Sequence, residues 1–325
     1  MSTPLLFTPF QLRSVTFRNR IGVSPMCQYS SEDGFPNDWH LVHLGARAIG
    51  GAALVMVEAS AVSAIGRISP SDAGIWKDEH IAAWQKVTSF LTAHGAVPGV
   101  QLAHAGWKAS TPAPWAGEGT VAAADGGWEP IGVGSKSFSD SYPTPREATE
   151  NDIEQVCRQF KAAAHRAIAA GFRVVEVHAA HGYLLNSFLS PVSNKRTDAY
   201  GGSFENRTRL LFRVVSDVRH AVGDEVPLFV RLSTTDWVEG GWTLEDSINL
   251  SSRLRDAGVD LIDCSSGGIS PKAKIAVGPG YQTEFAAAIR RDSKIPTAAV
   301  GMITDPIQAE TIVRTGQADL VLLAR

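Results

Sequence analysis

Short runs of apolar residues recur along the chain, and most of them are followed by a stretch with helical spacing. Several runs, such as AALVMVEASAV and PLFVRLST, are apolar without alternation, which is typical of strands whose two faces are both covered. These runs predict eight strands. They lie at residues 20–26, 52–62, 97–106, 172–179, 227–234, 260–267, 296–302 and 319–325.

The segments between the runs carry start and stop signals for helices. The helix predicted at 78–94 has apolar positions at helical spacing and ends before Gly95. A second helix is predicted at 149–170, because Thr149 is a suitable N-cap and acidic residues follow in the first turn. Two more are predicted from a Thr-x-x-Asp pattern and from an Asp-Pro start, and they span 243–257 and 305–315.

Strands that alternate with helices predict a parallel sheet in an α/β protein. Eight such units predict a (β/α)8 TIM barrel, with residues 1–325 as one domain. A doubly wound sheet is the weaker alternative, because no Gly-x-Gly-x-x-Gly sequence follows the first strand. We expect an N-terminal hairpin that caps the barrel and a lid formed by the long loop 107–148 after the third strand. Since the last strand reaches Arg325, we expect the final helix and a C-terminal tail to be absent.

Composition and charge narrow the function classes. The chain has 44% hydrophobic and 19% charged residues, as globular enzymes do, and its net charge of -3 gives no reason to expect nucleic acid or membrane as partner. No apolar run reaches the roughly 18 residues of a membrane span and no signal peptide is evident, so we expect a cytoplasmic protein. The dispersed cysteines Cys27, Cys157 and Cys264 exclude a Cys-x-x-Cys metal or iron–sulfur motif.

Polar side chains gather at the predicted carboxyl ends of the strands, where barrel enzymes place their active sites. The segment EVHAAHGYL brings His178, His181 and Tyr183 to the end of the fourth strand. A catalytic zinc site would need about three protein ligands, and no third ligand forms a recognised motif here. Structural histidines are another alternative. The interpretation we favour is that two imidazoles hold a carbonyl oxygen while the phenol donates a proton.

A second pattern indicates phosphate binding after the seventh and eighth strands. Gly301 follows the seventh strand, the helix that begins near Asp305 would direct its positive end there, and Arg325 ends the eighth strand. Arg231 lies within an apolar strand and therefore needs an anionic partner, either a cofactor or, as the simpler alternative, Glu176. From its pattern alone, Cys27 is best interpreted as a buried, inert thiol.

The chain resembles the Old Yellow Enzyme family of flavin-dependent ene-reductases, and within it the YqjM-like or xenobiotic-reductase-A-like class. The resemblance covers essentially the whole chain. It implies an FMN-containing barrel that takes hydride from NAD(P)H, with NADPH favoured, and reduces C=C bonds conjugated to carbonyl or nitro groups by a ping-pong mechanism. The most specific segments are SPMCQYS (24–30), VEASAV (57–62), GVQLAHAG (99–106), EVHAAHGYLLNSFLSPVSNKRTDAYGGSFENR (176–207) and AVGMITD (299–305).

The resemblance also implies roles for individual residues. His178 and His181 would hold the substrate oxygen, Tyr183 would be the proton donor, and Tyr29 and Lys108 would lie on the substrate side. Cys27 would tune the flavin's redox potential, and Arg231 would lie beside its N1 edge. No metal is expected. The positions that match flavin contacts are Ser24, Pro25, Met26, Cys27, Ala59, Gln101 and Arg231, with Gly301, Ala324 and Arg325 at the phosphate.

Two positions depart from the family pattern. Ala324 stands where the family often has glycine, and Trp107 replaces an arginine in the usual AHAGRKA segment. Relatives continue for some tens of residues beyond the last strand, and they imply a homo-oligomer, either a dimer or a tetramer. The remaining alternatives are a 2,4-dienoyl-CoA reductase, which needs a cysteine cluster, a metal-dependent hydrolase, and a flavin-binding scaffold without activity.

Overall fold

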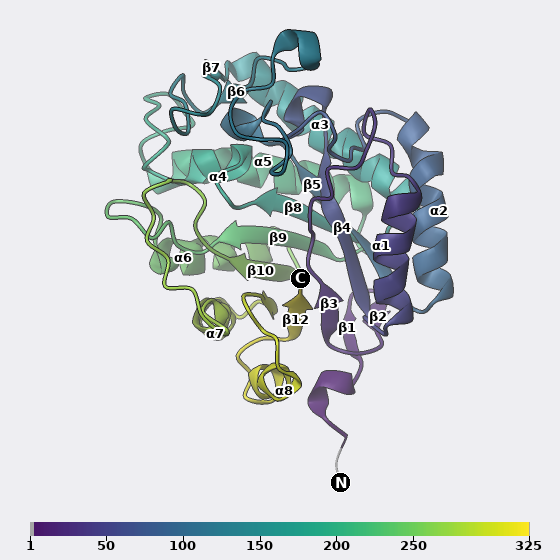
Figure 1. Cartoon of the computed structure of the whole chain (residues 1–325). Coiled ribbons are helices and arrows are strands. Elements are labelled where there is room, and N and C mark those ends of the chain that lie inside the picture. The colour runs from purple at the N-terminus through teal and green to yellow at the C-terminus, as the bar shows by residue number, and fades with distance from the viewer. Residues whose placement is uncertain (1–2, 325) are drawn as a thin grey trace.

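The computed structural model describes residues 3–324, and within them eight parallel strands pair into a closed barrel (Figure 1). All eight strands predicted from the apolar runs are present, and the last pairs with the first to close the ring. In their order around the barrel the strands are β3 (Ile21–Val23), β4 (Leu54–Ala61), β5 (Val97–Ala103), β8 (Val174–Ala179), β9 (Leu228–Ser233), β10 (Leu261–Ser265), β11 (Thr297–Ala299) and β12 (Leu320–Leu323).

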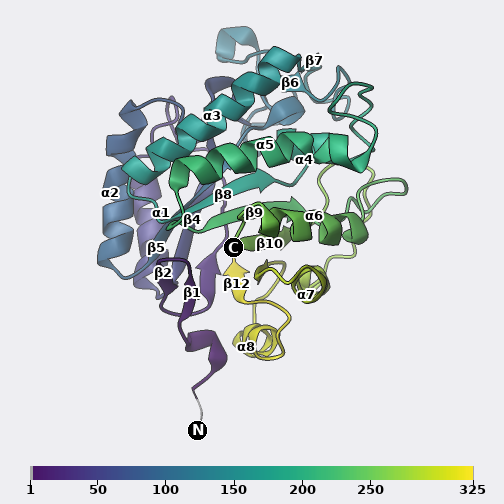
Figure 2. The ribbon, with the colours of Figure 1, turned by 180° about the vertical axis from the view of Figure 1, so that it is seen from behind.

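Helices cover the outside of the barrel, and Figure 2 shows three of them, α3, α5 and α6, across one side. The caps predicted at Thr149 and Thr243 are confirmed, since each forms a capping box with an aspartate three residues later. The predicted helices are α2 (Glu79–Ala93), α3 (Glu150–Ala169), α6 (Leu244–Asp256) and α8 (Pro306–Arg314). The apolar pattern does not predict α1 (Asp38–Ile49), α4 (Leu184–Leu189), α5 (Phe204–Val222) or α7 (Thr283–Ser293).

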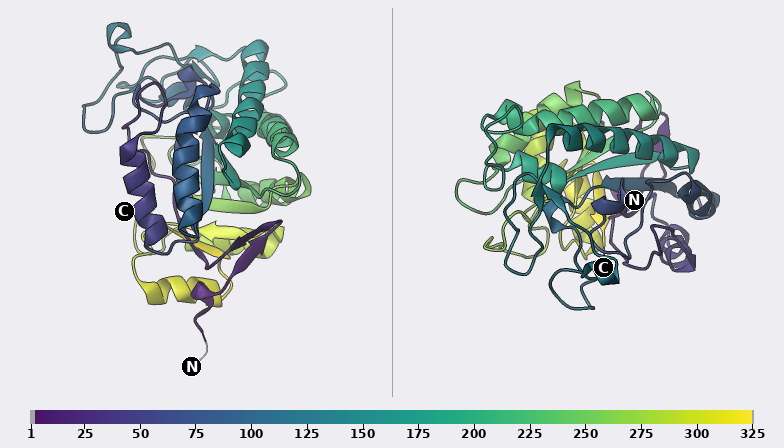
Figure 3. Two further views of the ribbon diagram at one scale, coloured as in Figure 1. Left: turned by 90° about the vertical axis from the view of Figure 1, so that its right-hand side faces the viewer. Right: turned by 90° about the horizontal axis from the view of Figure 1, so that it is seen from above.

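The long loop predicted after the third barrel strand is confirmed. Residues 107–148 follow β5 and contain a small parallel sheet of β6 (Ile131–Gly132) and β7 (Arg146–Glu147). Two short 3-10 turns lie at the start of this loop and within it. Two others lie near the N-terminus and after β4. These turns are η1 (Leu5–Phe7), η2 (Ala64–Gly66), η3 (Gly106–Lys108) and η4 (Ala123–Asp125). The left view of Figure 3 shows the loop at the end of the molecule opposite the N-terminal hairpin.

The N-terminal hairpin closes the amino end of the barrel, as predicted. It consists of β1 (Phe10–Leu12) and β2 (Val15–Phe17), which pair antiparallel. Val15 and Phe17 are buried in a separate apolar cluster with side chains from the barrel interior. The larger cluster lies between the strands and the surrounding helices. The hairpin thus seals one end of the barrel, which leaves the carboxyl ends of the strands as the open face.

Candidate active site

A layer of buried charged and amide side chains lies in the barrel just above the apolar end. Gln101, Glu176, Arg231 and Asp263 come from four neighbouring strands, and each is at least 94% buried. The amide of Gln101 donates to Glu176 Oε1 over 2.8 Å. Arg231 Nε lies 3.2 Å from Asp263 Oδ2. The simpler alternative, an ion pair of Arg231 with Glu176, is not what the structure shows, because adjacent strands β9 and β10 bring Asp263 directly beside Arg231.

This layer has more hydrogen-bonding capacity than the described residues satisfy. Four buried polar atoms make no hydrogen bond, namely Glu176 Oε2, both carboxylate oxygens of Asp263, and Arg231 Nε. Arg231 Nε lies close to Asp263 Oδ2 without forming a hydrogen bond to it. Burial, followed by the nearby charge of Asp263, raises the pKa of Glu176 to about 8. Burial also raises the pKa of Asp263. Buried polar groups normally have partners, so this layer is suited to a polar ring that carries both donors and acceptors.

His178, His181 and Tyr183 meet at the carboxyl end of β8, as predicted. The ring centroids of the two histidines are 5.1 Å apart, with their planes almost perpendicular at 88°. The ring of Tyr183 lies 5.0 Å from that of His178. Three polar rings therefore share one edge of the open face, next to the charged layer.

Both histidines are neutral donors in this environment. Burial lowers the pKa of His178 and of His181 well below the usual value, and the charge of Arg231 adds to the effect. His178 Nδ1 accepts the backbone N–H of Ala180 at 3.3 Å, so the ring proton of a neutral His178 is on Nε2. His181 Nε2 lies 2.7 Å from Ser265 Oγ at the end of β10. Each imidazole is thus held by a fixed neighbour.

The turn that carries His181 has an unusual backbone held by several contacts. His181 has φ of +60°, and its N–H donates to Ser233 Oγ over 2.9 Å. A side chain at Gly182, where φ is +77°, would place Cβ 2.2 Å from the carbonyl oxygen of Gly268. Lys108 Nζ donates to the carbonyls of His181 and Gly268. Such a conformation persists only when the surroundings enforce it, so the turn is a rigid support for the histidine.

Lys108 lies behind the turn that carries His181. Its ammonium group is 3.9 Å from the ring centroid of Phe138 in the long loop, in addition to its two backbone carbonyls. Burial lowers its pKa to about 7. These contacts show that Lys108 joins the long loop to the turn, while a direct contact with substrate stays a prediction.

The segment after β3 approaches the same face. The backbone N–H of Ser24 donates to the carbonyl of Leu323 over 2.8 Å, which anchors the segment to β12. Pro25 and Met26 follow, and burial raises the pKa of Cys27 well above its usual value. Cys27 is therefore a thiol and not a thiolate at neutral pH.

A buried contact between Glu58 and His40 supports this segment from behind. A β-bulge in β4 shifts the register between Val57 and Ala59. Glu58 Oε2 accepts the N–H of Gln28 at 2.9 Å, and Glu58 Oε1 lies 3.2 Å from His40 Nε2 on α1. Further along, Tyr29 has φ of +49° and meets Trp115 of the long loop edge-on. The bulge therefore ties the segment after β3 to its neighbours.

The predicted phosphate site stays a prediction, and the structure describes where two of its three residues lie. Gly301 and Ala324 follow the paired strands β11 and β12, so they are neighbours at the open face. Arg325 lies outside the described residues. α8 begins at Pro306 after Asp305, as predicted, and Asp305 Oδ1 accepts the N–H groups of Ile307 and Gln308. The helix end is capped by its own side chain.

Sequence reasoning missed Asp72, which lies in the loop between β4 and α2. Burial raises its pKa to about 8. Its Oδ2 accepts the N–H of Ile68 at 2.6 Å, whereas Oδ1 is buried without a partner among residues 3–324. Asp72 and Tyr183 both line a cavity of about 10 Å³. Nothing in the polar loop sequence SPSDAG indicates this position, because only the folded barrel brings the loop beside Tyr183.

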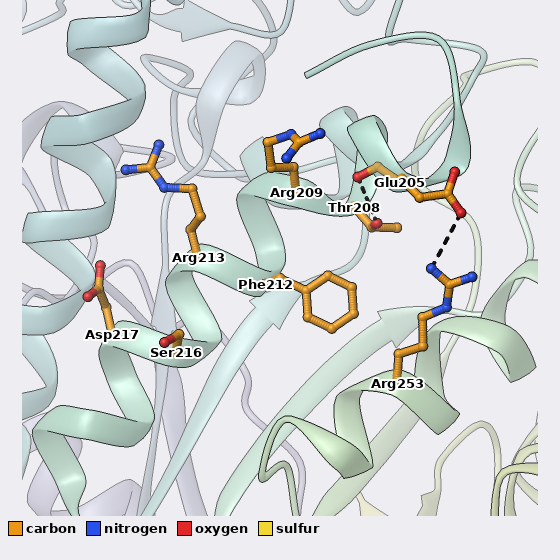
Figure 4. Close-up of a pocket in the computed structure, with 8 residues that line it drawn as sticks. All are labelled: Glu205, Thr208, Arg209, Phe212, Arg213, Ser216, Asp217 and Arg253. Carbon is orange, nitrogen blue, oxygen red and sulfur yellow. Dashed lines mark hydrogen bonds and ion pairs between the residues drawn. The ribbon is translucent and has the colours of Figure 1, made fainter. Parts of the chain in front are cut away.

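One groove lies away from the strand ends. The groove in Figure 4 has a volume of about 560 Å³ and runs along α5, with Arg253 of α6 3.5 Å from Glu205. None of the predicted site residues lines it. Across residues 3–324, no group of three His, Cys, Asp or Glu side chains is arranged to hold a metal ion. No helix in the same range is long and apolar enough to cross a membrane.

Comparison with known proteins agrees with this geometry. The model of the NADH:flavin oxidoreductase / NADH oxidase family matches residues 5–325. The chain is 48% identical over 323 residues to the NADPH dehydrogenase of Geobacillus sp. (strain WCH70), covering 99% of this chain and 90% of that protein. It shares a TM-score of 0.83 and 27% identity with morphinone reductase in complex with tetrahydroNAD, covering 99% of this chain and 87% of that one.

A further solved structure is that of 2-naphthoyl-CoA reductase in complex with 2-naphthoyl-CoA, with a TM-score of 0.90 and 28% identity. That alignment covers 99% of this chain, which spans only 50% of the length of the reductase. Together these findings define a flavin oxidoreductase built on a TIM barrel. The chain belongs to the NADH:flavin oxidoreductase / NADH oxidase family, that of Old Yellow Enzyme, and it is an NAD(P)H-dependent enzyme. The resemblance seen in the sequence is therefore confirmed.

Proposed function

We propose that the protein is an FMN-dependent ene-reductase that prefers NADPH and reduces the C=C bond of α,β-unsaturated carbonyl or nitro compounds by a ping-pong mechanism. The observation that carries this proposal is the arrangement of two neutral imidazoles and a phenol beside a buried, incompletely satisfied polar layer. The 48% identity to an NADPH dehydrogenase supports the choice of reductant.

The polar layer fits a flavin ring. Arg231 supplies positive charge for the edge that becomes anionic on reduction, and Gln101 supplies an amide for the ring's carbonyl and N–H groups. Bound FMN would accept hydride from NADPH and deliver it to the alkene. We assign the remaining contacts, by resemblance, to Ser24, Pro25, Met26, Cys27 and Ala59 around the ring, and to Gly301, Ala324 and Arg325 at the phosphate.

The rings after β8 fit the substrate. His178 Nε2–H, together with the ring N–H of His181, would donate hydrogen bonds to the substrate carbonyl oxygen. These hydrogen bonds would stabilise negative charge as it develops on that oxygen. Burial raises the pKa of Tyr183 well above its usual value, so its hydroxyl stays protonated and can donate to the α-carbon. Burial raises the pKa of Tyr29 as well, which leaves a second neutral phenol on the substrate side.

Two further assignments belong to this proposal. The chain is a single flavin-binding domain, an assignment supported by barrel strands drawn from positions 21 to 323 of the sequence. A homodimer or homotetramer stays a prediction from the resemblance, and the particle mass in solution measured by light scattering tests it.

An absorbance spectrum of the purified protein tests the function. We expect a flavin band that disappears on anaerobic addition of NADPH and returns on addition of cyclohexenone. A colourless protein that cannot be reconstituted with FMN would contradict the proposal. A flavin band that bleaches with NADPH but never returns with an enone or a nitroalkene would leave the family assignment intact and overturn the ene-reductase activity.

A further inference from the structure

A large cavity lies between the long loop and the loops that follow β8 and β10. Its volume is about 560 Å³, within the range of small-molecule sites. Trp107 and Phe138 provide aromatic surface, and Lys136, Lys195 and Lys272 come from three different loops around it. The three loops therefore converge on one hollow that the predicted site residues do not line.

The cavity is strongly positive. Among the described residues, none of the three lysines has a carboxylate within ion-pair distance. The only acidic residue in the lining, Glu147, lies 3.2 Å from Arg196 Nη1 and is already paired. The whole chain has a net charge of -3, so this excess of positive charge is a local feature. It favours a ligand that carries several negative charges.

The cavity is separated from the catalytic turn by one layer of side chains. Trp107 Nε1 donates to the carbonyl of Gly182 over 2.5 Å, next to Tyr183. On the other side, Phe138 packs on the ammonium group of Lys108, which binds the carbonyl of His181. A ligand that lies against Trp107 and Phe138 is therefore one layer of side chains away from the turn that carries His181 and Tyr183.

We propose that this cavity binds the phosphorylated adenosine half of NADPH while the nicotinamide lies in the active site. The lysines supply charge for the phosphates, and the aromatic surface suits a purine. This inference rests on the proposed use of NADPH. Coenzyme A thioesters carry a similar phosphorylated adenosine group, so the test must distinguish a thioester substrate from the reductant.

The test uses the flavin-loaded K136E/K272E variant and three electron donors, NADPH, NADH and 1-benzyl-1,4-dihydronicotinamide, which lacks phosphate and adenosine. We expect KM for NADPH to rise roughly tenfold, since two attractive contacts become repulsive. KM for NADH should rise less, and the rate with the truncated donor should not change. The control variant K86E/K161E makes the same change of charge on α2 and α3, outside the cavity.

Binding gives a readout that does not depend on turnover. Adenosine 2′,5′-bisphosphate should bind to the parent protein in titration calorimetry and more weakly to K136E/K272E. An unchanged KM for NADPH in K136E/K272E overturns the inference, as does an equal loss with the truncated donor. A raised KM for crotonyl-CoA alone also overturns it, because the cavity then serves a thioester. Flavin reduction by the truncated donor separates these failures from failure of the proposed function.

A second and independent observation concerns the small cavity beside Tyr183. Its volume of about 10 Å³ holds about one water molecule. Asp72 and Tyr183 are the polar side chains in its lining, and the unpartnered Oδ1 of Asp72 is buried. Burial and the nearby Glu58 raise the pKa of Asp72, whereas Arg67 and the N–H groups of Ile68 and Ser69 lower it. Cys27 and Tyr29, which feel the charge of Asp72, are themselves neutral.

We infer that Asp72 returns a proton to Tyr183 through one water molecule in this cavity. After Tyr183 has protonated the α-carbon, the water gives a proton to the phenolate and takes one from the Asp72 carboxyl group. Solvent then restores the proton on Asp72, and no electrons move in this step. This inference rests on the proposed role of Tyr183 as proton donor.

The variant D72N tests the relay, because its amide oxygen can still accept the N–H of Ile68 while the acidic proton is lost. Stopped-flow spectroscopy should show normal flavin reduction by NADPH and roughly 10²-fold slower reoxidation by cyclohexenone. The parent rate should fall above about pH 8, and D72N should lose this dependence. D72E should restore part of the rate.

Infrared spectroscopy of the flavin-free protein gives a second readout, since D72N should lose the band of a buried protonated carboxyl group. Reoxidation of D72N at the parent rate, with the parent pH profile, overturns the relay. The variant Y183F separates this result from the proposed function: slow reoxidation in Y183F alone keeps Tyr183 as donor and removes only Asp72.

Discussion

The two ends of the barrel interior differ sharply, and on two neighbouring strands, β9 and β10, the change occurs over two residues. On β9 the interior position at the amino end is Phe229, and the next on the same face is Arg231. On β10 the corresponding pair is Leu261 and Asp263. The amino end packs apolar side chains against the hairpin, whereas the carboxyl end buries charges without full hydrogen bonding.

This difference separates stability from function within one set of strands. The hairpin end gains free energy from apolar burial, and the buried charge on that side, Asp319, is paired with Arg290. The other end holds carboxyl groups and a guanidinium in a desolvated layer, which costs folding free energy that a ligand can offset on binding. We therefore expect substitutions at the two ends to affect different measurements.

The largest effect on stability is expected at the hairpin end. Phe17 is fully buried, and Phe17→Ala should lower the free energy of unfolding by about 3–5 kcal/mol through lost apolar burial and a new cavity. Urea denaturation of the flavin-free protein measures this loss. Phe7→Ala is a control, because Phe7 is 55% exposed and should cost less than about 1 kcal/mol. Equal losses for the two variants would contradict the hairpin's role as a core element.

At the other end, His178→Ala should affect rate more than stability. Loss of the Nε2–H donor should slow cyclohexenone-dependent flavin reoxidation by about 10²–10³-fold, equivalent to about 3–4 kcal/mol in the activation free energy. Stopped-flow spectroscopy measures the rate, and the flavin spectrum shows whether the cofactor is still bound. His165→Ala on the exposed side of α3 is the matched control. A parent-like rate for His178→Ala would show that the imidazole does not bind the substrate oxygen.

The buried carboxyl group of Glu176 should make the free energy of unfolding depend on pH. Its folded-state pKa of about 8 lies above the unfolded value, so the folded protein binds the extra proton and loses stability as pH rises from about 4.5 to 8. The slope approaches about 1.4 kcal/mol per pH unit for one proton. Glu176→Gln keeps an acceptor for Gln101 and should flatten this slope in urea denaturation of the flavin-free protein. An equally steep slope in the variant would show that Glu176 is not the group that holds the proton.

The sequence predicts these two ends unequally well. The apolar runs locate every barrel strand. His178, His181 and Tyr183 are close in sequence, so their meeting at the end of one strand could be predicted. The pairing of Arg231 with Asp263 depends on the register between β9 and β10, which no local pattern encodes. Closure of the barrel decides such contacts between distant segments.

The helices that the pattern does not predict have physical reasons of their own. α1 exposes Trp39, Val42 and Ile49, so its apolar residues do not form one clean stripe. α7 follows Gln282, whose side chain makes no cap hydrogen bond, and the helix therefore has no start signal. In contrast, α3 has both the capping box at Thr149 and a clear stripe, and its bounds agree with the prediction within one residue.

The smallest effect is expected at Ser265, which would orient His181 without contacting the substrate itself. Ser265 Oγ lies 2.7 Å from His181 Nε2 at the end of β10, and Ser265→Ala removes this contact without changing the barrel. We expect cyclohexenone-dependent reoxidation to slow by roughly fivefold, in line with a net value of about 1 kcal/mol for one hydrogen bond. Flavin reduction by NADPH and the free energy of unfolding should stay near the parent values.

Ser266→Ala is a neighbouring control, because the Ser266 hydroxyl donates to Gln282 and not to a histidine. If Ser265→Ala slowed the reaction as strongly as His178→Ala, the orientation of His181 would be as important as the donors themselves, and the carboxyl end would be a single interdependent unit.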